Sequence, residues 1–216
     1  MTQKKTPTPE QIQEYRRICE TAVTSEDYAK VNAFTDEYDT FTYVFEESGR
    51  MGVKDAAGEV LVPALFDDVA YTFADFFRGT AVAVIRSGKM ALVKPDGKGT
   101  MLTDFIYDSI HFQDGFYFMV KDGKYGLATS GGHVVVPTEQ DEVFMPINHL
   151  ASFTKDGRNG FAMIGTGLIT DAEYEDYDLT ESDYLKVYRN GLPGYIDAEG
   201  NFTEDEDEMF FNAACD

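Results

Sequence analysis

The sequence predicts a mainly β protein, an array of about five three-stranded antiparallel units that follows a short helical segment. Three observations lead to this fold class. A short phrase built on a turn glycine recurs five times, the residues before each copy alternate in polarity, and helical spacing is confined to the first 36 residues. Such a recurrence is typical of proteins that stack copies of one supersecondary unit.

Two helices are predicted before the array, within residues 1–36. The segment Thr8–Gln11, "TPEQ", combines a capping box with proline at the first helical position. The apolar face of the first helix would carry Ile12, Tyr15, Cys19 and Ala22. The second helix is expected over about residues 25–34, and its apolar face would carry Tyr28, Val31 and Phe34. We interpret the helices as a cap over the terminal edge of the array. The alternative is an appendage that binds a partner.

The array is expected over residues 37–211, with units that start near residues 48, 87, 122, 156 and 190, and a tail at 212–216. Each unit begins with Ser-Gly, Asp-Gly or Asn-Gly. These pairs favour a two-residue type I′ hairpin, because both central residues of that turn need positive φ. The turn glycines are Gly49, Gly88, Gly123, Gly157 and Gly191, which are 39, 35, 34 and 34 residues apart.

The residues around each turn follow the pattern of a strand with one buried face. Six and four residues before the glycine, all ten residues are apolar: Tyr43 and Phe45, Val82 and Val84, Tyr117 and Met119, Ala151 and Phe153, Leu185 and Val187. Three residues after the glycine a small residue always follows, namely Gly52, Ala91, Gly126, Gly160 and Gly194. We expect it to leave room for a neighbouring strand or ring.

A second turn and a third strand complete each unit. The glycine of this turn is Gly58, Gly97, Gly132, Gly167 or Gly200. It is expected to take the left-handed position of a bulged hairpin. An aromatic residue and an acid follow the third strand, as Phe66-Asp67, Tyr107-Asp108 and Tyr174-Glu175, with Gln140-Asp141 as a degenerate copy.

Together these features resemble the WG repeat (WG containing repeat) family, most clearly over residues 49–68, "GRMGVKDAAGEVLVPALFDD". The tryptophan of that family precedes the small residue, and this chain has none. Met51, Met90, Tyr125, Asn159 and Pro193 stand in its place. The resemblance covers roughly residues 37–211 and implies a β-rich binding array of bacterial proteins, with no shared catalytic apparatus.

The composition is strongly acidic. The formal net charge is −21, from 39 acidic and 18 basic residues, and residues 171–216 contribute −13 of it. A nucleic-acid partner is therefore not expected, since phosphate backbones are bound through lysine and arginine. Without a visible signal sequence or an apolar run of about 18 residues, we expect no membrane partner and a cytoplasmic location. The oligomeric state stays open.

The sequence contains no catalytic motif, and we expect no enzyme activity, cofactor or bound metal. His111, His133 and His149 lie in unrelated contexts. The segment "DAEYEDYD", residues 171–178, is rich in carboxylates, but Asp176 and Ser182 stand where a calcium loop needs glycine and glutamate.

Protein binding is the function that the sequence favours. Its most specific form is an acidic inhibitor or immunity protein that neutralises a basic toxin, for which a nuclease is a suitable target. The candidate partner contacts lie in "YEDYDLTESDYLKVY", residues 174–188, and are Tyr174, Asp176, Tyr177, Asp178, Glu181, Asp183 and Tyr184. One alternative is a scaffolding repeat protein whose acidity only confers solubility. A more remote one is a carbohydrate-binding protein or hydrolase.

Overall fold

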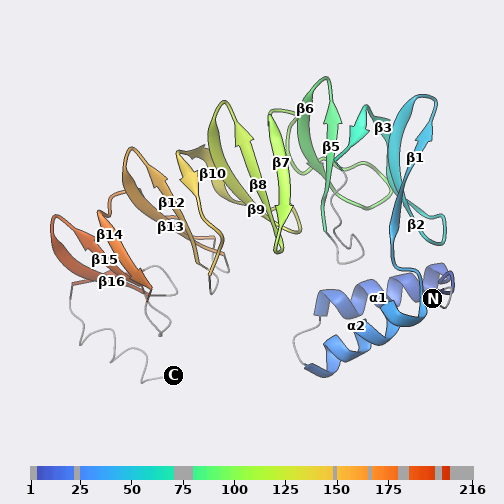
Figure 1. The fold of residues 1–216 in the computed structure, drawn as a ribbon, viewed down its shortest axis with the longest axis horizontal. Helices are drawn as coiled ribbons and strands as arrows, with labels where there is room; N and C mark the ends of the chain where they lie inside the picture. Colours follow the sequence, from blue (N-terminus) through green and yellow to red (C-terminus); the bar gives the residue numbers. More distant parts are fainter. Residues whose placement is uncertain are drawn as a thin grey trace. The chain divides into compact units, whose positions relative to one another are not determined.

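Small antiparallel sheets make up most of the fold (Figure 1). The computed structural model describes residues 4–21, 25–70, 80–147, 150–164, 167–179, 185–197 and 201–204. Helices α1 (Pro9–Thr21) and α2 (Ser25–Glu37) precede the strands. The predicted fold class, mainly β with a short helical segment at the start, is confirmed.

Five sheets lie within the described residues, and most of their strands join neighbours through hairpins. In chain order the sheets contain β1 (Thr42–Glu47), β2 (Arg50–Asp55) and β3 (Val60–Phe66); β4 (Asp68–Val69), β5 (Val82–Arg86) and β6 (Lys89–Val93); β7 (Ser109–Gln113), β8 (Phe116–Lys121), β9 (Lys124–Thr129) and β10 (Val134–Gln140); β11 (Glu142–Val143), β12 (Leu150–Lys155) and β13 (Arg158–Met163); β14 (Asp176–Leu179), β15 (Leu185–Arg189), β16 (Leu192–Ile196) and β17 (Phe202–Thr203).

The chain divides into two compact units, residues 1–119 with 128–133 and residues 120–127 with 134–216. In the first unit, Val53 and Phe66 of the first sheet pack with Val84 of the second. In the second unit, Phe161 of the fourth sheet packs with Val187 of the fifth. Within each unit, therefore, the apolar core lies between successive sheets.

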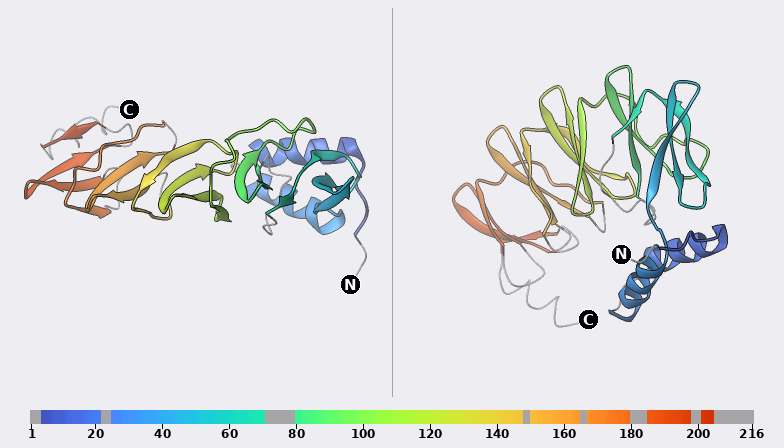
Figure 2. Two further views of the ribbon diagram at one scale, coloured as in Figure 1. Left: turned by 90° about the horizontal axis from the view of Figure 1, so that it is seen from above. Right: turned by 45° about the vertical axis from the view of Figure 1, so that its right-hand side comes forward.

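The helical segment forms as predicted. The N–H of Thr8 donates to Oε1 of Gln11 at 2.9 Å, and the N–H of Gln11 donates to Oγ1 of Thr8 at 3.3 Å, which is the predicted capping box. Ile12, Tyr15 and Val31 form a small buried core where the two helices lie against each other (Figure 2).

The second helix is longer than predicted, since α2 continues to Glu37. Of the expected inner-face residues, Ala22 lies outside the described residues, and the side chains of Cys19 and Tyr28 are not described. The cap remains a proposal. It is supported by Ala57 of the β2–β3 turn, which packs against the helical core.

The turns have the backbone that their sequences predict. Both central residues have positive φ in each first turn: Ser48 and Gly49, Ser87 and Gly88, Asp122 and Gly123, Asp156 and Gly157, and Asn190 and Gly191. Gly58, Gly97, Gly132 and Gly167 of the second turns also have positive φ, and Gly200 lies outside the described residues. A further turn of the first type, Asp114-Gly115, joins β7 to β8. Sequence reasoning missed it, although its dipeptide is the same signal.

Four of the described sheets contain a strand that the sequence did not predict. Directly after the aromatic-acid pair, the chain pairs with the first hairpin strand of the next sheet: β4 with β5, β7 with β8, β11 with β12 and β14 with β15. We call β4, β7, β11 and β14 the covering strands. Two of them, β4 and β11, have only two residues, which is too short for an alternating pattern to be recognised.

The third strand of the predicted unit is present in three of the described sheets, as β3, β10 and β17. In the second and fourth sheets it is reduced to isolated bridges such as Val93–Met101 and Ala162–Ile169. The repeat units therefore share one strand order but differ in how completely the third strand pairs.

The small residue after each first turn is buried and allows the predicted close approach. A Cβ on Gly52 would lie 2.6 Å from the carbonyl oxygen of Val62, and a Cβ on Gly126 would lie 2.7 Å from that of Val136. Both distances are shorter than heavy atoms tolerate without displacement. The neighbouring strand therefore needs glycine at these positions.

In the fourth sheet the space beside the small residue holds an aromatic ring. Phe153 lies opposite Gly160 on the paired strands, and its ring occupies the position that a Cβ on Gly160 would need. In the second sheet the small residue is Ala91, and the smaller Val84 lies opposite it. The two facing positions are therefore matched in size.

Eight of the ten apolar residues predicted to face inward are buried: Val82, Val84, Tyr117, Met119, Ala151, Phe153, Leu185 and Val187. The prediction is wrong for the first sheet. Tyr43 is 42% exposed and Phe45 is half-buried. They lie on β1, which has no covering strand among the described residues.

In three repeats the acid that ends the aromatic-acid motif connects two successive hairpin turns; these acids are Asp67, Asp141 and Glu175. Asp67 forms an ion pair with Arg50, directly after the first turn glycine, and accepts the N–H of Ser87 in the next turn at 2.7 Å. We call this arrangement the turn clamp. Glu175 repeats it with Arg158, at 3.2 Å, and with the N–H of Gly191, at 3.0 Å.

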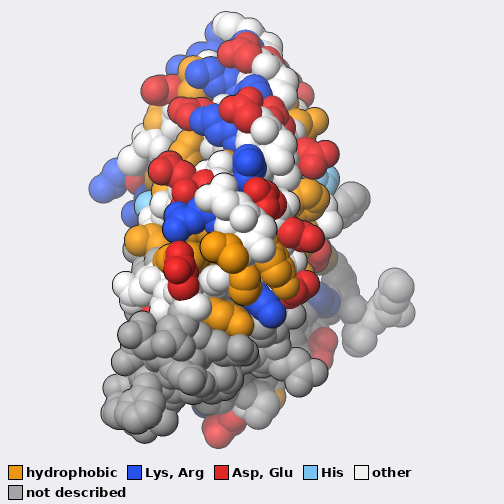
Figure 3. Space-filling model, turned by 90° about the vertical axis from the view of Figure 1, so that its left-hand side faces the viewer, with side chains coloured by type: hydrophobic (Ala, Val, Ile, Leu, Met, Phe, Trp, Pro, Cys, Tyr) orange, Lys and Arg blue, Asp and Glu red, His pale blue; other side chains and the backbone are white. Residues whose placement is uncertain are grey.

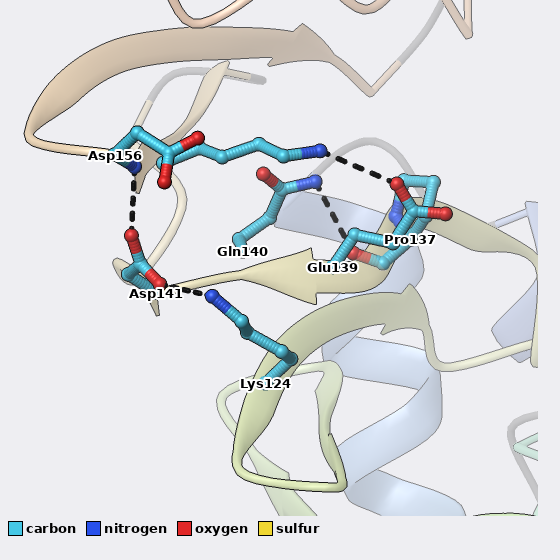
Figure 4. A network of polar contacts seen from close by, with 7 residues as sticks. Lys124, Pro137, Glu139, Gln140, Asp141 and Asp156 are labelled. Atoms are coloured by element: carbon cyan, nitrogen blue, oxygen red, sulfur yellow. Dashed lines mark hydrogen bonds and ion pairs between the residues drawn. The ribbon is translucent and has the colours of Figure 1, made fainter.

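The turn clamp of Asp141 is drawn in Figure 4. This carboxylate pairs with Lys124 and accepts the N–H of Asp156 at 2.7 Å. The hydrogen bond from Lys124, and next the N–H of Asp156, hold the pKa of Asp141 below its ordinary value of 3.8. The recurring acid is thus a structural residue in the clamps that the structure describes.

Gln140 occupies the aromatic position of its repeat. It is 4% exposed, and its Nε2 donates to the carbonyl oxygen of Pro137 at 3.4 Å. Its Oε1 is buried without a hydrogen-bond partner among the described atoms. At the equivalent position of the first repeat the buried residue is Phe66, which has no polar side-chain atom. The degenerate copy therefore leaves a polar atom unsatisfied that the aromatic residue of the repeat avoids.

We expect Gly160→Ala to lower the free energy of unfolding by about 1–3 kcal/mol, because the new Cβ meets the ring of Phe153. The double variant Phe153→Val/Gly160→Ala copies the Val84–Ala91 pair and should recover about 1 kcal/mol or more relative to the sum of the single changes. Urea denaturation of the four proteins measures this coupling. Strict additivity would show that the two positions are not matched in size.

We expect the carboxylate of Asp141 to make stability depend on pH. Its pKa is lower in the folded than in the unfolded chain. The stabilisation is therefore present above the unfolded value, about pH 4, and is lost as pH falls through the folded pKa.

Asp141→Asn should be less stable at neutral pH and should lose less stability than the wild type on acidification. Asp36→Asn, at an exposed acid of α2, is the control and should behave as the wild type. Denaturant unfolding between pH 3 and pH 7 measures both, and equal acid dependence in Asp141→Asn and the wild type would contradict the clamp.

We expect Gln140→Phe to raise the free energy of unfolding by about 1 kcal/mol, since it removes a buried unpaired amide oxygen and restores the aromatic residue of the repeat. Gln140→Glu keeps the size but buries a charge, and it should destabilise the protein. Thermal and urea unfolding compare the variants. A Gln140→Phe protein that is less stable than the wild type would contradict this interpretation.

Candidate functional site

The predicted contact residues do not form one surface. Tyr174 is 3% exposed and packs against Phe161, with ring centroids 5.6 Å apart. This burial raises the pKa of Tyr174. Its ring therefore belongs to the core between the fourth and fifth sheets. Glu181, Asp183 and Tyr184 lie outside the described residues.

The three other candidates lie on β14 and are separated by the alternation of the strand. Tyr177 points toward Phe161, in an edge-to-face contact at 5.1 Å, and donates to Oγ of Ser152 at 3.2 Å. Asp176 and Asp178, on either side of it, point to the opposite face of the sheet. Sequence proximity thus grouped side chains that the strand separates.

Both acids of β14 are exposed, and each also has a structural contact. Asp176 accepts the N–H of Tyr177 at 2.9 Å, and Asp178 accepts the hydroxyl of Tyr188 at 2.9 Å. Neither forms an ion pair with a described residue. The charges of β14 are therefore available for long-range attraction. In Figure 3 acidic and basic side chains are interspersed over one face of the molecule.

An apolar hollow of about 350 Å³ lies next to Tyr177 in the second unit. Its lining comes from the segment after β11, from β12 and from β14, and consists of Phe144, Met145, Ile147, Leu150, Ser152 and Tyr177. Phe144 is 43% exposed and Ile147 is 51% exposed. Apart from Ser152 and the hydroxyl of Tyr177, these residues offer only apolar contact.

Backbone hydrogen bonds hold the walls of the apolar hollow. The N–H of Phe144 donates to the carbonyl oxygen of Ser152 at 2.9 Å, and Ile147 and Leu150 exchange two such bonds, each at 2.9 Å. The apolar residues are thus displayed on a fixed backbone. Sequence reasoning missed this site, although the run from Val143 to Ile147 lies outside the repeat pattern and is rich in large apolar residues.

An exposed acid, Glu142, lies two residues before Phe144 of the apolar hollow. Glu142 lies opposite Thr154 of β12, and the N–H of Phe144 donates to Ser152 of the same strand, so strand alternation directs both side chains to one face. Glu142 forms no ion pair with any residue that the structure describes. The hollow therefore offers an apolar surface beside an unneutralised carboxylate.

The described residues include no cluster of three or more His, Cys, Asp and Glu side chains that would hold a metal ion. No helix in the described part of the chain is long and apolar enough to cross a membrane.

Residues 96–125 match the family model described as WG containing repeat. This segment is therefore similar to one WG repeat. The match ends at Tyr125, directly before Gly126, where the tryptophan of the family was expected. Tyr125 is 42% exposed. A WG repeat suggests a module for protein interaction, which agrees with the contact surface just described. Comparison with curated protein sequences gives no match.

Several solved structures are distantly similar. Hsv2 of Kluyveromyces lactis is 12% identical, with a TM-score of 0.35, over 76% of this chain and 60% of that chain. A eukaryotic initiation factor is 12% identical, with a TM-score of 0.35, over 71% and 47%. PorZ of Porphyromonas gingivalis, a surface component of the type-IX secretion system, is 12% identical, with a TM-score of 0.24, over 81% and 28%. The chain spans at most 60% of these structures, and similarities at this level carry no argument about function.

Proposed function

We propose that this chain binds a basic protein and, in the most specific form of the proposal, that it is an inhibitor or immunity protein that neutralises a basic toxin such as a nuclease. The observation that carries the proposal is the apolar hollow with the unneutralised Glu142 beside it, in a chain with a net charge of −21. Apolar anchors next to acids suit a partner that presents apolar and basic side chains together.

The two properties of the surface have different roles in binding. Large apolar side chains in a desolvated pocket supply most of the affinity at protein interfaces. Charge accelerates the encounter between oppositely charged proteins and makes its rate sensitive to salt. Phe144 and Ile147 fit the first role, and the acids Glu142, Asp176 and Asp178 fit the second.

The inhibitor form of the proposal follows from the charge of the target. A nuclease must attract a polyanion to its active site, so an acidic protein is attracted to the same surface. A scaffolding role would use the repeat for contact as well, but it would not require the acids.

The proposal is tested with a partner captured from lysate of the native cells by the tagged chain. We expect a basic protein whose association rate falls about tenfold or more between low and physiological salt. Glu142→Gln/Asp176→Asn/Asp178→Asn should slow association several-fold. The control Asp36→Asn/Glu59→Gln/Asp104→Asn makes the same change in charge on the first unit and should have a smaller effect.

The inhibitor form has its own readout. Expression of the captured partner alone should arrest growth, and co-expression of this chain should restore it. If binding of the partner changes neither with salt nor on substitution of the three acids, the inhibitor proposal is wrong and the scaffolding alternative is favoured. A panel of hydrolase substrates that gives turnover would overturn a purely binding role.

A further inference from the structure

The first strand of the array lacks the neighbour that every other described hairpin strand of its type has. The covering strands pair with β5, β8, β12 and β15, but β1 pairs only with β2 within the described residues (Figure 1). No described strand therefore covers the outer edge of β1, where the repeat itself places a strand.

The hydrogen bonds of the other sheets show which atoms of β1 are involved. In the second sheet, the N–H of Asp67 donates to the carbonyl oxygen of Ile85 and the N–H of Ala70 to that of Ala83, both at 2.9 Å. Ile85 and Ala83 lie three and five residues before the turn glycine. The residues of β1 at these positions are Glu46 and Val44.

The fourth and fifth sheets repeat this pattern at the same positions. The carbonyl oxygens of Thr154 and Ser152 accept the N–H groups of Asp141, at 2.8 Å, and of Phe144, at 2.9 Å. In the fifth sheet, the carbonyl oxygen of Tyr188 accepts the N–H of Glu175 at 2.8 Å. The pattern is therefore a property of the repeat rather than of one sheet.

Val44 and Glu46 have no such partner among the described residues. The acid that precedes β1 in the repeat is Asp39, and its N–H donates instead to the carbonyl oxygen of Lys5, at 2.8 Å. Val44 is 38% exposed and Glu46 is exposed. Among the residues that the structure describes, none therefore occupies the outward-facing backbone groups of Val44 and Glu46, which can pair with an added strand.

The side chains of β1 are also more exposed than their equivalents in the fourth sheet. Tyr43 and Phe45 are more exposed than their equivalents Ala151 and Phe153, which are 0% and 2% exposed. In the fourth sheet, the covering-strand residue Val143 pairs with Phe153. An apolar residue of an added strand would lie opposite Phe45 in the same way.

We propose that β1 accepts an extended segment of the basic partner, which completes the first sheet as a covering strand completes the others. The identity of the occupant rests on the proposed function and on charge. Glu46 and Glu47 are exposed and form no ion pair with a described residue, so they favour lysine or arginine beside the apolar residue. A second copy of the chain would bring another charge of −21 to this edge and is disfavoured. Binding of this kind is β-augmentation, in which main-chain hydrogen bonds supply affinity and side chains supply selectivity.

The experiment uses the full chain and a random peptide library displayed on phage. We expect the enriched peptides to pair an aliphatic or aromatic residue with an adjacent lysine or arginine. When added as synthetic peptides, they should slow amide hydrogen exchange at Val44 and Glu46 about tenfold or more. This measurement needs no variant and therefore does not depend on whether a substituted chain folds.

Val44→Pro removes an outward-facing N–H, and proline is tolerated on edge strands. It should weaken peptide binding about tenfold or more, whereas the matched control Val44→Thr, which keeps the N–H, should stay within about twofold. Ile147→Ser, in the apolar hollow, should leave this binding unchanged.

Different outcomes separate this proposal from the proposed function. Basic peptides that depend on Ile147 and bind Val44→Pro normally would overturn the β1 site and leave the basic partner in place. Peptides that protect Val44 and Glu46 but carry no basic residue would contradict the basic partner. Failure to enrich any peptide, or protection elsewhere only, would overturn the β1 site.

Discussion

The turn clamp, in which one carboxylate binds two successive hairpin turns, is the interaction on which the rest of the repeat unit depends. Asp67 holds Arg50 of one hairpin with its side chain and binds the N–H of Ser87 in the next. Its own N–H donates to Ile85, so the same residue also starts the covering strand. The distance between turns, the register of the covering strand and the overlap of the two apolar faces are therefore set together. An acid one residue earlier or later would place its N–H on the wrong side of the strand.

The features of the fold that the sequence predicted are those with strong local chemistry. Dipeptides such as Asp156-Gly157 determine the turn because their backbone conformation is accessible to few other pairs. The small residue was recognised because glycine within a strand is costly unless something approaches it closely, as Phe153 approaches Gly160. The period of the repeat then extended these local signals to the whole array.

The features that the sequence did not predict depend on contacts between distant segments. The two-residue strand β11 has no pattern of its own and exists because β12 offers it a paired edge. Tyr43 and Phe45 have the same apolar spacing as their equivalents but are more exposed, and no described strand covers β1. In the predicted site, strand alternation and core packing assign Tyr174, Tyr177 and Asp178 to three different environments, which residue type alone does not reveal.

The covering strands also bear on the order in which the protein is made. Each of them precedes in the chain the hairpin that it completes, so during synthesis from the N-terminus it leaves the ribosome first. A newly made hairpin therefore finds its edge partner already present and need not wait for later residues. Since unpaired edges are where nascent β-proteins pair wrongly with other chains, a repeat that supplies the covering strand in advance shortens the time during which each sheet is open.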